Sequence, residues 1–323
     1  MNHSRLTVRV ARRRAEAEGI VSFELASLDG SELPAFEAGA HIDVHVPGGL
    51  VRQYSLCNCP SERHRYQIAV LRDDTSRGGS AGLHNAVHEG DEIQISAPRN
   101  HFSLARGRVR HLLFAGGIGL TPLLCMAEQL SREGAAFSLH YCARSSSRAA
   151  FMERITGSPW ADSARCHFDD ADQAQRIDLD ALLADPQPDL HLYVCGPQGF
   201  MSAVLDKARL LGWPSDRLHY EYFSAAPAPA ANHDEASFDI RLARSGRVVP
   251  VSATQTVIQA LVAAGVDVPV SCEQGICGTC LTRVLDGEPD HRDLFLSPDE
   301  QARNDQFLPC CSRAKSRMLV LDL

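Results

Sequence analysis

The sequence predicts a multidomain protein with three successive architectures: an antiparallel β-barrel, an α/β domain with a parallel sheet, and a small mixed α+β domain. Partly alternating strand segments punctuated by glycine and proline fill 1–105, which favours the barrel. Over 106–224, strand segments alternate with helical ones, as in a parallel sheet wound on both faces. Alternating alanine and proline over 225–236 are typical of a semi-rigid linker, so the last domain spans 237–323.

Each expected element follows from a local pattern. In the first domain, alternation or a short apolar run predicts strands over 6–13, 20–27, 41–47, 51–56, 65–72 and 91–97, and a short helix within 80–90. In the second, the expected strands are 111–117, 137–144, 164–170, 190–197 and 218–223, with helices over 122–134 and 198–212. In the third, a hairpin around Ser245-Gly246, a helix over 256–265 and a strand over 317–323 predict one helix across a small mixed sheet.

Composition limits the classes of function. A formal net charge of −8 argues against a nucleic-acid partner, which would favour a basic surface. No segment is long and apolar enough for a membrane span, and the first residues lack the apolar stretch of a signal peptide. The expected location is therefore cytoplasmic. In a reducing compartment, eleven cysteines indicate metal ligation or catalysis rather than disulfides.

The strongest motif is a cysteine loop. Cys272, Cys277 and Cys280 have the spacing C-x4-C-x2-C, and either Cys310 or Cys311 supplies a fourth thiol. This is the plant-type pattern for one [2Fe–2S] cluster held by four thiolates, and glycines between the cysteines allow the tight turns that wrap the cluster. A structural zinc site is the alternative, although zinc ribbons usually carry two C-x2-C pairs.

The loop and the segments after it resemble a known family. CEQGICGTC at 272–280, LDGEPDHRDLFLS at 285–297 and CCSRAKS at 310–316 are similar to the C-terminal ferredoxin domain of the phthalate dioxygenase reductase family. The resemblance covers the whole chain in the order flavin, nicotinamide, ferredoxin. It implies a β-grasp fold for the third domain and FMN, NADH and a [2Fe–2S] cluster as cofactors. The family motif Cys-x-Ser-Arg-Ala-Lys makes Cys310 the fourth cluster ligand.

A motif in the first domain resembles the R-x-Y-S sequence of ferredoxin–NADP reductase-like proteins. Its residues are Arg52, Tyr54 and Ser55, at the end of a predicted strand. Arg52 suits a phosphate, and Tyr54 suits the flavin ring or its ribityl chain. The hydroxyl of Ser55 is expected near flavin N5, where hydride arrives.

A second segment of the first domain suits an anion. Arg77, Gly78, Gly79 and Ser80 combine a guanidinium, glycine amides and a hydroxyl just before a possible helix. On its own this is a glycine-rich hairpin tip; the resemblance assigns it the FMN phosphate. Phe223 matches the family aromatic that contacts the flavin and would otherwise be taken as a core residue.

A glycine-rich turn joins the first strand and helix of the second domain. It contains Gly116, Gly117, Gly119, Thr121 and Pro122 and differs from the G-x-G-x-x-G fingerprint. The glycines let a pyrophosphate approach the backbone, and the helix N-terminus favours the anion. Thr121 and Pro122 are expected at the N-cap and in the first turn of the helix. The resemblance assigns this turn to NAD(P).

The family motif C-G-P is present as Cys195, Gly196 and Pro197 at the end of the fourth strand of this domain. The resemblance places the cysteine beside the nicotinamide ring, whereas a core thiol is the bland alternative. No acidic residue ends the second strand, and Arg144 or Arg148 could bind a 2′-phosphate. The resemblance nevertheless favours NADH.

The resemblance implies hydride transfer from NADH to the flavin and single electrons through the cluster to a terminal oxygenase with a Rieske centre. Ser55 and Cys195 are the residues assigned to catalysis, because they would align the hydride donor and acceptor. Seven carboxylates within 286–305 either steer a basic partner or belong to a solvated loop. The alternative function is a free-standing NAD(P)H flavin or quinone reductase without a protein acceptor.

Overall fold

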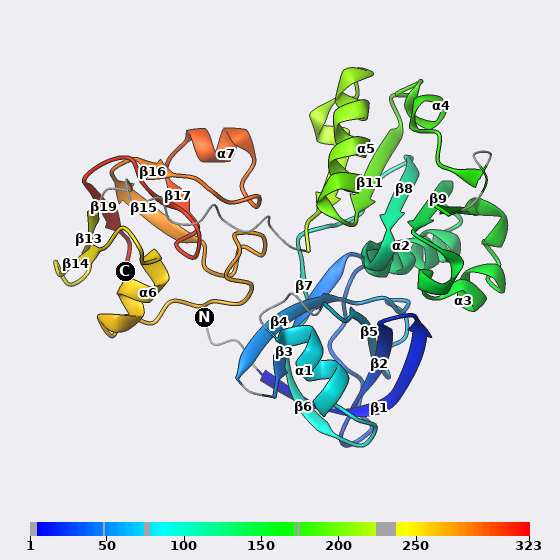
Figure 1. Ribbon diagram of the computed structural model, residues 1–323, viewed down its shortest axis with the longest axis horizontal. Coiled ribbons are helices and arrows are strands. Elements are labelled where there is room, and N and C mark those ends of the chain that lie inside the picture. The colour runs from blue at the N-terminus through cyan, green and yellow to red at the C-terminus, as the bar shows by residue number, and fades with distance from the viewer. Residues whose placement is uncertain (1–4, 48, 74–77, 171, 173–174, 224–236) are drawn as a thin grey trace. The chain divides into compact units, whose positions relative to one another are not determined.

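The computed structural model describes residues 5–47, 49–73, 78–170, 172, 175–223 and 237–323. The chain divides into two compact units, Met1–Phe223 and Ser224–Leu323 (Figure 1). The expected linker over 225–236 lies outside the described residues, and the exact domain boundaries stay predictions. In the described part of the chain, no helix is long and apolar enough to cross a membrane.

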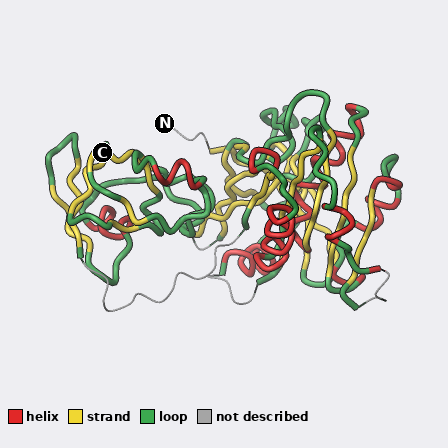
Figure 2. The backbone as a smooth tube through the Cα atoms, turned by 90° about the horizontal axis from the view of Figure 1, so that it is seen from above, coloured by secondary structure: helices red, strands yellow, loops and turns green. Residues whose placement is uncertain are grey.

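The first seven strands form one antiparallel sheet that curls into the predicted barrel (Figures 1 and 2). They are β1 (Arg5–Ala17), β2 (Ile20–Ser27), β3 (Ala40–Val46), β4 (Leu50–Ser55), β5 (Tyr66–Leu71), β6 (Glu92–Ser96) and β7 (Arg99–Asn100). Their order is β4-β3-β6-β1-β2-β5, with β7 beside β3. Alternation decides which side chains face inward: Val8 and Val10 are buried and Arg9 is exposed. The short helix α1 (Gly79–Ala86) is present as expected.

Five parallel strands form the second sheet of the first unit, in the order β10-β9-β8-β11-β12. They are β8 (Arg110–Gly116), β9 (Phe137–Ala143), β10 (Ala164–Phe168), β11 (Leu190–Cys195) and β12 (Leu218–Glu221). The predicted helices are α2 (Leu120–Glu133) and α5 (Gln198–Leu210), while the short α3 (Met152–Thr156) and α4 (Leu179–Leu183) were not expected. Because chain order runs outward from β8 in one direction and from β11 in the other, the carboxyl ends of these two strands form a topological switch point.

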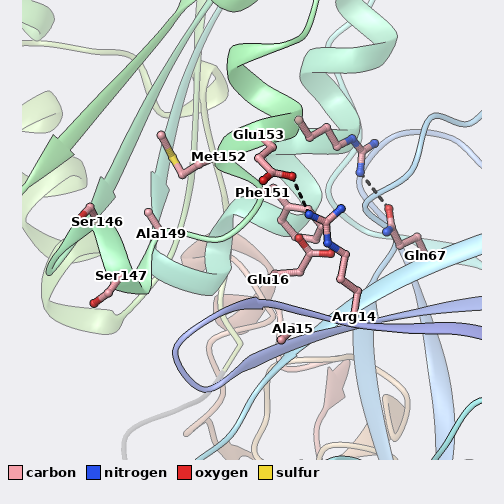
Figure 3. Close-up of a pocket in the computed structure, with 11 residues that line it drawn as sticks. Arg14, Ala15, Glu16, Gln67, Ser146, Ser147, Ala149, Phe151, Met152 and Glu153 are labelled. Atoms are coloured by element: carbon pink, nitrogen blue, oxygen red, sulfur yellow. Dashed lines mark hydrogen bonds and ion pairs between the residues drawn. The ribbon is translucent and has the colours of Figure 1, made fainter.

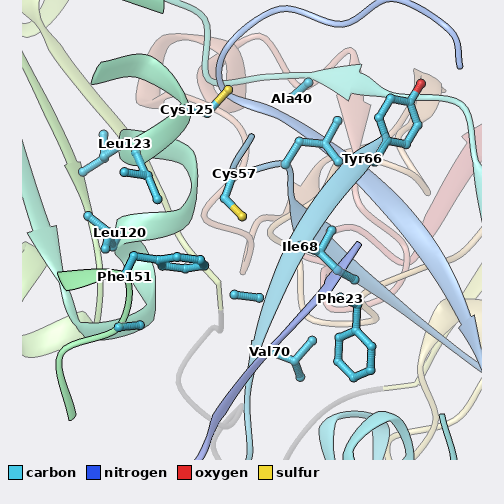
Figure 4. Close-up of a cluster of buried hydrophobic side chains, with 14 of the residues drawn as sticks. Phe23, Ala40, Cys57, Tyr66, Ile68, Val70, Leu120, Leu123, Cys125 and Phe151 are labelled. Carbon is cyan, nitrogen blue, oxygen red and sulfur yellow. The ribbon is translucent and has the colours of Figure 1, made fainter. Parts of the chain in front are cut away.

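Both faces of the parallel sheet are covered, and its residues alternate accordingly. Leu113 of β8 belongs to a core shared with α2 and the barrel, whereas Phe114 belongs to a core shared with α5. Figure 4 shows Leu123 of α2 opposite Cys57 and Ile68 of the barrel. One continuous core therefore joins the barrel to the parallel sheet, which explains why these two architectures make a single compact unit.

The second unit is a small mixed sheet with its own core, as predicted. The order is β14-β13-β19-β15-β17, built from β13 (Phe238–Leu242), β14 (Val248–Val251), β15 (Thr282–Asp286), β17 (Gln306–Phe307) and β19 (Met318–Leu321). β13 and β19 are parallel, and β13 and β14 form the expected hairpin. The helix α6 (Val257–Ala263) begins with a capping box between Thr256 and Gln259. The strands β15 and β17 were not expected, nor were β16 (Pro289–Asp290), α7 (Pro298–Ala302) and β18 (Arg313–Ala314).

Histidines cross the parallel sheet in hydrogen-bonded pairs. Nδ1 of His191 lies 2.9 Å from Nε2 of His219, and Nδ1 of His140 lies 3.1 Å from Nε2 of His167. On β8, His111 lies opposite His191. Burial lowers the pKa of His111, His140 and His219 to about 4 each, and it also lowers the pKa of His167 and His191.

We expect the first unit to lose stability as the pH falls from 6.5 to about 4, the usual and the folded values for these histidines. In that range the unfolded chain binds protons that the folded chain does not. The free energy of unfolding therefore decreases as the pH decreases. Each deeply shifted histidine contributes up to ~3 kcal/mol. Thermal unfolding across this range measures the effect. His111→Phe should flatten the profile, while His88→Gln, at an exposed histidine, should not; identical slopes for wild type and His111→Phe would contradict the explanation.

Candidate functional site

The four cysteines assigned to the cluster are buried together in the second unit. Cys272, Cys277 and Cys280 lie between α6 and β15, and Cys310 lies between β17 and β18. The thiol of Cys272 contacts those of Cys277 and Cys310, and the thiol of Cys310 also contacts that of Cys280. The neighbouring thiols of Cys277 and Cys310 lower the pKa of Cys272, and the thiol of Cys272 in turn raises the pKa of Cys277 and Cys310. These reciprocal shifts follow from the close contact of the thiols, and iron binds the thiolate form.

Backbone amides around the cysteines point at sulfur. The N–H of Gln274 donates to Sγ of Cys272 at 3.3 Å, and the N–H of Thr279 donates to Sγ of Cys277 at 3.5 Å. Such bonds stabilise negative charge on the sulfur atoms and tune the potential of a bound cluster. The chemistry of the donor set therefore fits a [2Fe–2S] cluster.

Two glycines shape the loop. Gly275 and Gly278 have φ values of +73° and +69°, which residues with a side chain rarely adopt. A Cβ at Gly275 would lie 2.5 Å from Sγ of Cys311, and a Cβ at Gly278 would overlap the ring of Phe295. Glycine is therefore needed at both positions for the backbone conformation and for close packing.

Cys311 has different surroundings from Cys310. Its sulfur lies against Gly275 and 3.7 Å from both the carbonyl oxygen of Leu308 and Oγ of Ser312. With Cys310 as the ligand, Cys311 would be a buried small apolar residue; its side chain is partly buried. Because Cys310 contacts the other ligand cysteines on both sides, the geometry supports Cys310 as the fourth ligand.

Zinc is the alternative occupant that the spacing left open. Zinc requires four ligands around a single point, whereas the thiolates of a [2Fe–2S] cluster divide between two irons. Within the described residues, no three histidine, cysteine or carboxylate side chains are arranged to hold one metal ion.

The two predicted flavin motifs lie against one another in the barrel. A Cβ at Gly79, the first residue of α1, would lie 2.6 Å from both Cγ and Nε of Arg52 on β4. Gly78, with φ +91°, occupies the N-cap position of this helix and is exposed. The Arg52 side chain thus packs beside the N-terminus of α1, and together they suit the phosphate of FMN.

The remaining flavin residues take less expected positions. Oγ of Ser80 accepts a hydrogen bond from the N–H of Asp73 at 3.1 Å, so this hydroxyl also holds the backbone. Arg77 lies outside the described residues. Tyr54 is partly buried against the barrel core, and burial raises the pKa of its phenol.

Ser55 joins the barrel to the parallel sheet. Its side chain is buried, and its hydroxyl donates a hydrogen bond to Oε2 of Glu221, at the end of β12, over 3.2 Å. Burial raises the pKa of Glu221 to about 7. On β3, Nδ1 of His41 lies 3.9 Å from Oε1 of the same carboxylate.

Sequence reasoning missed Glu221 and His41. Glu221 was taken as part of a strand, and His41 as part of another. A usable signal was present for Glu221, because it stands two residues before Phe223 at the carboxyl end of a parallel strand, where ligand contacts are expected. No local signal marked His41.

Three glycines of the nicotinamide motifs allow two turns to pack closely. Ala115 of β8 lies opposite Cys195 of β11. A Cβ at Gly119 would overlap the carbonyl oxygen of Cys195, and a Cβ at Gly196 would lie 2.9 Å from Cα of Gly116. These glycines therefore hold the two turns together, a role distinct from the predicted approach of a pyrophosphate.

Gly117 faces open space instead. Its φ is +52°, and a Cβ there would meet no atom within 4 Å. The residue lies at the switch point between β8 and β11, where an open α/β sheet binds its ligand. A glycine that is needed neither for packing nor by a neighbouring side chain fits the close approach of a pyrophosphate.

The prediction that Thr121 caps α2 is wrong. The helix begins at Leu120 with Gly119 at the N-cap, and no side chain caps it. Oγ1 of Thr121 donates to the carbonyl oxygen of Ile118 at 3.1 Å. The helix starts earlier than expected because Gly117–Gly119 already form a 3₁₀ turn that runs into it. Pro122 lies in the first turn, as predicted.

Cys195 and Phe223 lie near the carboxyl edge of the sheet. Cys195 is fully buried beside Glu221, and burial raises the pKa of its thiol. A neutral thiol suits alignment of a ring rather than acid–base chemistry. Pro197 occupies the N-cap position of α5, and Phe223 is 36% exposed at the end of the first unit. The contacts of Cys195 with nicotinamide and of Phe223 with flavin stay predictions.

Alanine at Gly117 and at Gly119 should have opposite consequences. Gly117→Ala costs about 1 kcal/mol from its positive φ and should weaken NADH binding about tenfold, because the methyl group occupies the open side. Gly119→Ala should destabilise the first unit by about 3 kcal/mol through overlap with backbone. Isothermal titration with NADH and thermal unfolding separate the two effects. Equal NADH affinity in Gly117→Ala and wild type would remove Gly117 from the binding site.

A cavity of about 450 Å³ lies between the barrel and the parallel sheet (Figure 3). Two contacts cross the seam within it: Arg14 lies 2.7 Å from Glu153, and Arg154 donates to Oε1 of Gln67 at 2.9 Å. Figure 3 shows the contact between Arg14 and Glu153. The cavity therefore marks the seam between the two sheets, and we assign it no ligand.

The two arginines predicted as 2′-phosphate contacts differ. Arg148 forms an ion pair with Glu18 of the barrel at 2.7 Å, so its guanidinium is engaged across the seam. Arg144 is exposed. The pairing of Arg148 reduces its availability for a 2′-phosphate, which is consistent with NADH.

The acidic stretch over 286–305 is partly paired. Lys315 pairs with Glu288 at 3.1 Å, and Arg292 pairs with Asp290 at 2.7 Å. Asp293 is buried and accepts a backbone hydrogen bond. The stretch keeps an excess of carboxylates, so a solvated loop and a surface that steers a basic partner both stay open as interpretations.

Comparisons with known proteins agree with this arrangement. Residues 240–315 match the family model of the 2Fe-2S iron-sulfur cluster binding domain. A vanillate O-demethylase oxidoreductase of Pseudomonas sp. (strain HR199 / DSM 7063) is 56% identical over 98% of this chain and 100% of its own length. The phthalate dioxygenase reductase of Burkholderia cepacia is 42% identical over 98% of this chain and 97% of its own.

Solved structures show the same architecture. Phthalate dioxygenase reductase, described as a modular structure for electron transfer from pyridine nucleotides to [2Fe–2S], superposes with a TM-score of 0.76 at 41% identity, covering 99% of this chain and 98% of that one. An intact type IV self-sufficient cytochrome P450 monooxygenase gives 0.88 at 41% identity over 99% of this chain. This chain spans only 41% of that longer protein.

The fold and the sites define an oxidoreductase that passes electrons from a pyridine nucleotide through a flavin to a [2Fe–2S] centre. The chain belongs to the phthalate dioxygenase reductase family, whose members are reductase components of oxygenase systems. Its cofactors are FMN, NADH and the [2Fe–2S] cluster. The predicted multidomain fold, with barrel, parallel sheet and ferredoxin-like unit, is confirmed.

Proposed function

We propose that this chain supplies electrons to a Rieske-type terminal oxygenase that demethylates a vanillate-like aromatic ether. The observation that carries the proposal is 56% identity to a vanillate O-demethylase oxidoreductase, over 98% of this chain and 100% of that protein. Identity to the phthalate dioxygenase reductase of Burkholderia cepacia is lower, at 42%. Reductases that serve the same kind of oxygenase are expected to resemble one another most in the surface that meets it.

Each proposed cofactor position rests on the geometry already described. When bound, the flavin accepts hydride and releases electrons singly. Its phosphate is proposed beside Arg52 and the N-terminus of α1, and its reacting edge beside Ser55. The nicotinamide cofactor is proposed at Gly117. The full proposed contact set for the two organic cofactors is Arg52, Tyr54, Ser55, Arg77, Gly78, Gly79, Ser80, Gly116, Gly117, Gly119, Thr121, Pro122, Cys195, Gly196, Pro197 and Phe223.

The protein's part in hydride transfer is proposed to be alignment. Ser55 and Cys195 come from different sheets, yet both lie beside Glu221. A donor ring next to Cys195 and an acceptor ring next to Ser55 would therefore meet at the seam between the sheets. Holding both rings in one geometry is what such a step requires, because hydride passes directly between them.

A second acceptor is favoured by one observation. The same architecture, at a TM-score of 0.88, is part of a self-sufficient cytochrome P450 monooxygenase. A haem monooxygenase is therefore the alternative partner to a Rieske oxygenase.

Reconstitution distinguishes these partners. The purified chain is combined with NADH and, in parallel, with the oxygenase component of a vanillate O-demethylase, with phthalate dioxygenase oxygenase, and with a P450 that lacks its own reductase. We expect formation of demethylated product stoichiometric with NADH for the first, and weaker coupling for the others. Efficient coupling to the P450 alone would overturn the Rieske assignment. Rapid NADH oxidation without any of these proteins would support a free-standing reductase.

A further inference from the structure

Glu221 lies between two groups of different kinds. Oγ of Ser55 donates to Oε2 over 3.2 Å, and Nδ1 of His41 lies 3.9 Å from Oε1. The side chains of His41 and Glu221 are only 5% and 16% exposed, so neither is open to bulk water. The carboxylate is therefore enclosed, with a hydroxyl on one side and an imidazole on the other.

The reaction requires a proton to leave this region. Oxidation of one NADH by two one-electron clusters yields NAD⁺, two reduced clusters and one proton. The proton is released where the hydride was received, which in the proposed function is beside Ser55. A buried site without a route to solvent would retain it and oppose the next turnover.

A second histidine extends from His41 toward solvent. The rings of His41 and His101 lie 5.6 Å apart between centroids, at an angle of 34°. His41 is buried, whereas His101, in the loop after β7, is exposed. Ser55, Glu221, His41 and His101 therefore form a series that begins at the proposed flavin position and ends at the surface.

We propose that His41 and His101 form a proton exit that connects Glu221 to solvent. As Oγ of Ser55 accepts the proton released at the proposed flavin position, its own hydroxyl proton passes to Glu221 along the existing hydrogen bond. Glu221 passes a proton to Nδ1 of His41, the proton on Nε2 of His41 passes to His101, and His101 delivers a proton to water. A small rotation of the His41 ring closes the 3.9 Å gap to Oε1 of Glu221, and the neighbouring rings of His41 and His101 are close enough for a direct or water-bridged transfer. This inference rests on the proposed position of the flavin beside Ser55.

The surrounding charges suit transfer in this direction. Burial brings the pKa of Glu221 to about 7, so the carboxylate can both accept and release a proton near neutral pH. His101 is exposed overall, but the nearby protein removes part of the water around its imidazole; this partial desolvation, and then the charge of Arg99, lower its pKa, which favours release to water. Arg99 itself is paired with Asp43 at 2.6 Å.

Two further groups face this series. The thiol of Cys195 lies beside Glu221 and is held neutral by its burial. Arg99 pairs with His41 in the register of β7 and β3, so the arginine adjoins both histidines of the proposed exit. Neither group provides a competing base near neutral pH.

The test compares His41→Gln with His45→Gln in the holoprotein. His45 lies on the same strand and serves as the matched control. The first readout is a carbon-13 NMR titration of the oxidised, resting protein labelled at glutamate carboxyl carbons, with the Glu221 signal assigned by its loss in Glu221→Gln. The second is proton release into an indicator dye during a single turnover, recorded together with flavin reduction. FMN content and circular dichroism report folding and the proposed flavin site.

We expect His41→Gln to raise the pKa of Glu221 and to slow proton release at least about tenfold relative to flavin reduction. His45→Gln should match wild type in both. His101→Gln should slow proton release without moving the Glu221 titration. An unchanged Glu221 pKa and unchanged proton release in His41→Gln would overturn the proposal. If His41→Gln loses FMN, the titration of Glu221 in resting His41→Asn decides whether His41 influences this carboxylate. The flavin position is tested separately by Ser55→Ala, which should lose FMN where wild type retains it.

Discussion

Cys310→Ala should remove the visible absorption of the iron–sulfur cluster and leave that of the flavin. Cys310 is buried, and its thiol contacts those of Cys272 and Cys280. Although it lies about thirty residues after the loop, it therefore stands among the ligand thiols. A [2Fe–2S] cluster with three thiolates has one iron incompletely held and is lost or unstable. Iron content, absorption and electron paramagnetic resonance after dithionite reduction measure the change. Transfer to an oxygenase should fall to background.

The adjacent cysteine provides the matched control. Cys311→Val should retain the cluster spectrum, because the sulfur of Cys311 touches only Cys310 among the ligand thiols and packs against Gly275 and the backbone near Leu308, whereas Cys310 touches both Cys272 and Cys280. A small apolar side chain can fill that space, although the contact with Gly275 is tight and some loss of stability is expected. If Cys311→Val bleaches the protein while Cys310→Ala does not, the assignment is displaced by one residue.

A chain that ends at Phe223 should still oxidise NADH with ferricyanide but should not reduce an oxygenase. The first unit is compact by itself, with its core shared between the barrel and the parallel sheet. The core of the second unit is formed by other residues, among them Ile240 and Leu261. Removing residues 224–323 therefore takes away the cluster without opening the core that supports the proposed flavin and nicotinamide sites.

Two measurements check this separation. FMN content and the rate of flavin reduction by NADH should be close to those of the intact protein, and oxygenase-coupled turnover should be absent. The intact Cys310→Ala protein is the control, because it lacks the cluster but keeps the whole chain. Undiminished oxygenase turnover by the shortened chain would show that electrons leave directly from the flavin.

The parts of the site that could be predicted are those whose chemistry is local in sequence. Cys272, Cys277 and Cys280 are nearly adjacent, so their spacing alone indicates a cluster loop. The glycine-rich turn around Gly117 also follows a strand directly, and its place at the switch point follows from strand and helix alternation. Such patterns can be identified without knowing how distant segments pack.

The helix boundary at Thr121 shows where local rules fail. A threonine before a proline is a common N-cap signal, yet the preceding glycines continue the helix backward as a 3₁₀ turn. The close packing of Gly119 against the carbonyl of Cys195 holds that turn in place. Gly119 and Cys195 are 76 residues apart in the chain. A distant contact therefore decides where the helix begins.

The sequence by itself determined the order of three architectures, the cluster loop, and the two turns that suit phosphate groups, because each depends on residues close together in the chain. Only the tertiary structure decided which glycines pack and which face open space. It also brought Ser55 to Glu221 across 166 residues and placed His41 beside the same carboxylate. The physical reason is that a buried polar side chain takes its partner from whichever segment packs against it in the folded protein. Here the partners come from two different sheets, and neither strand has a local sequence pattern that identifies the other.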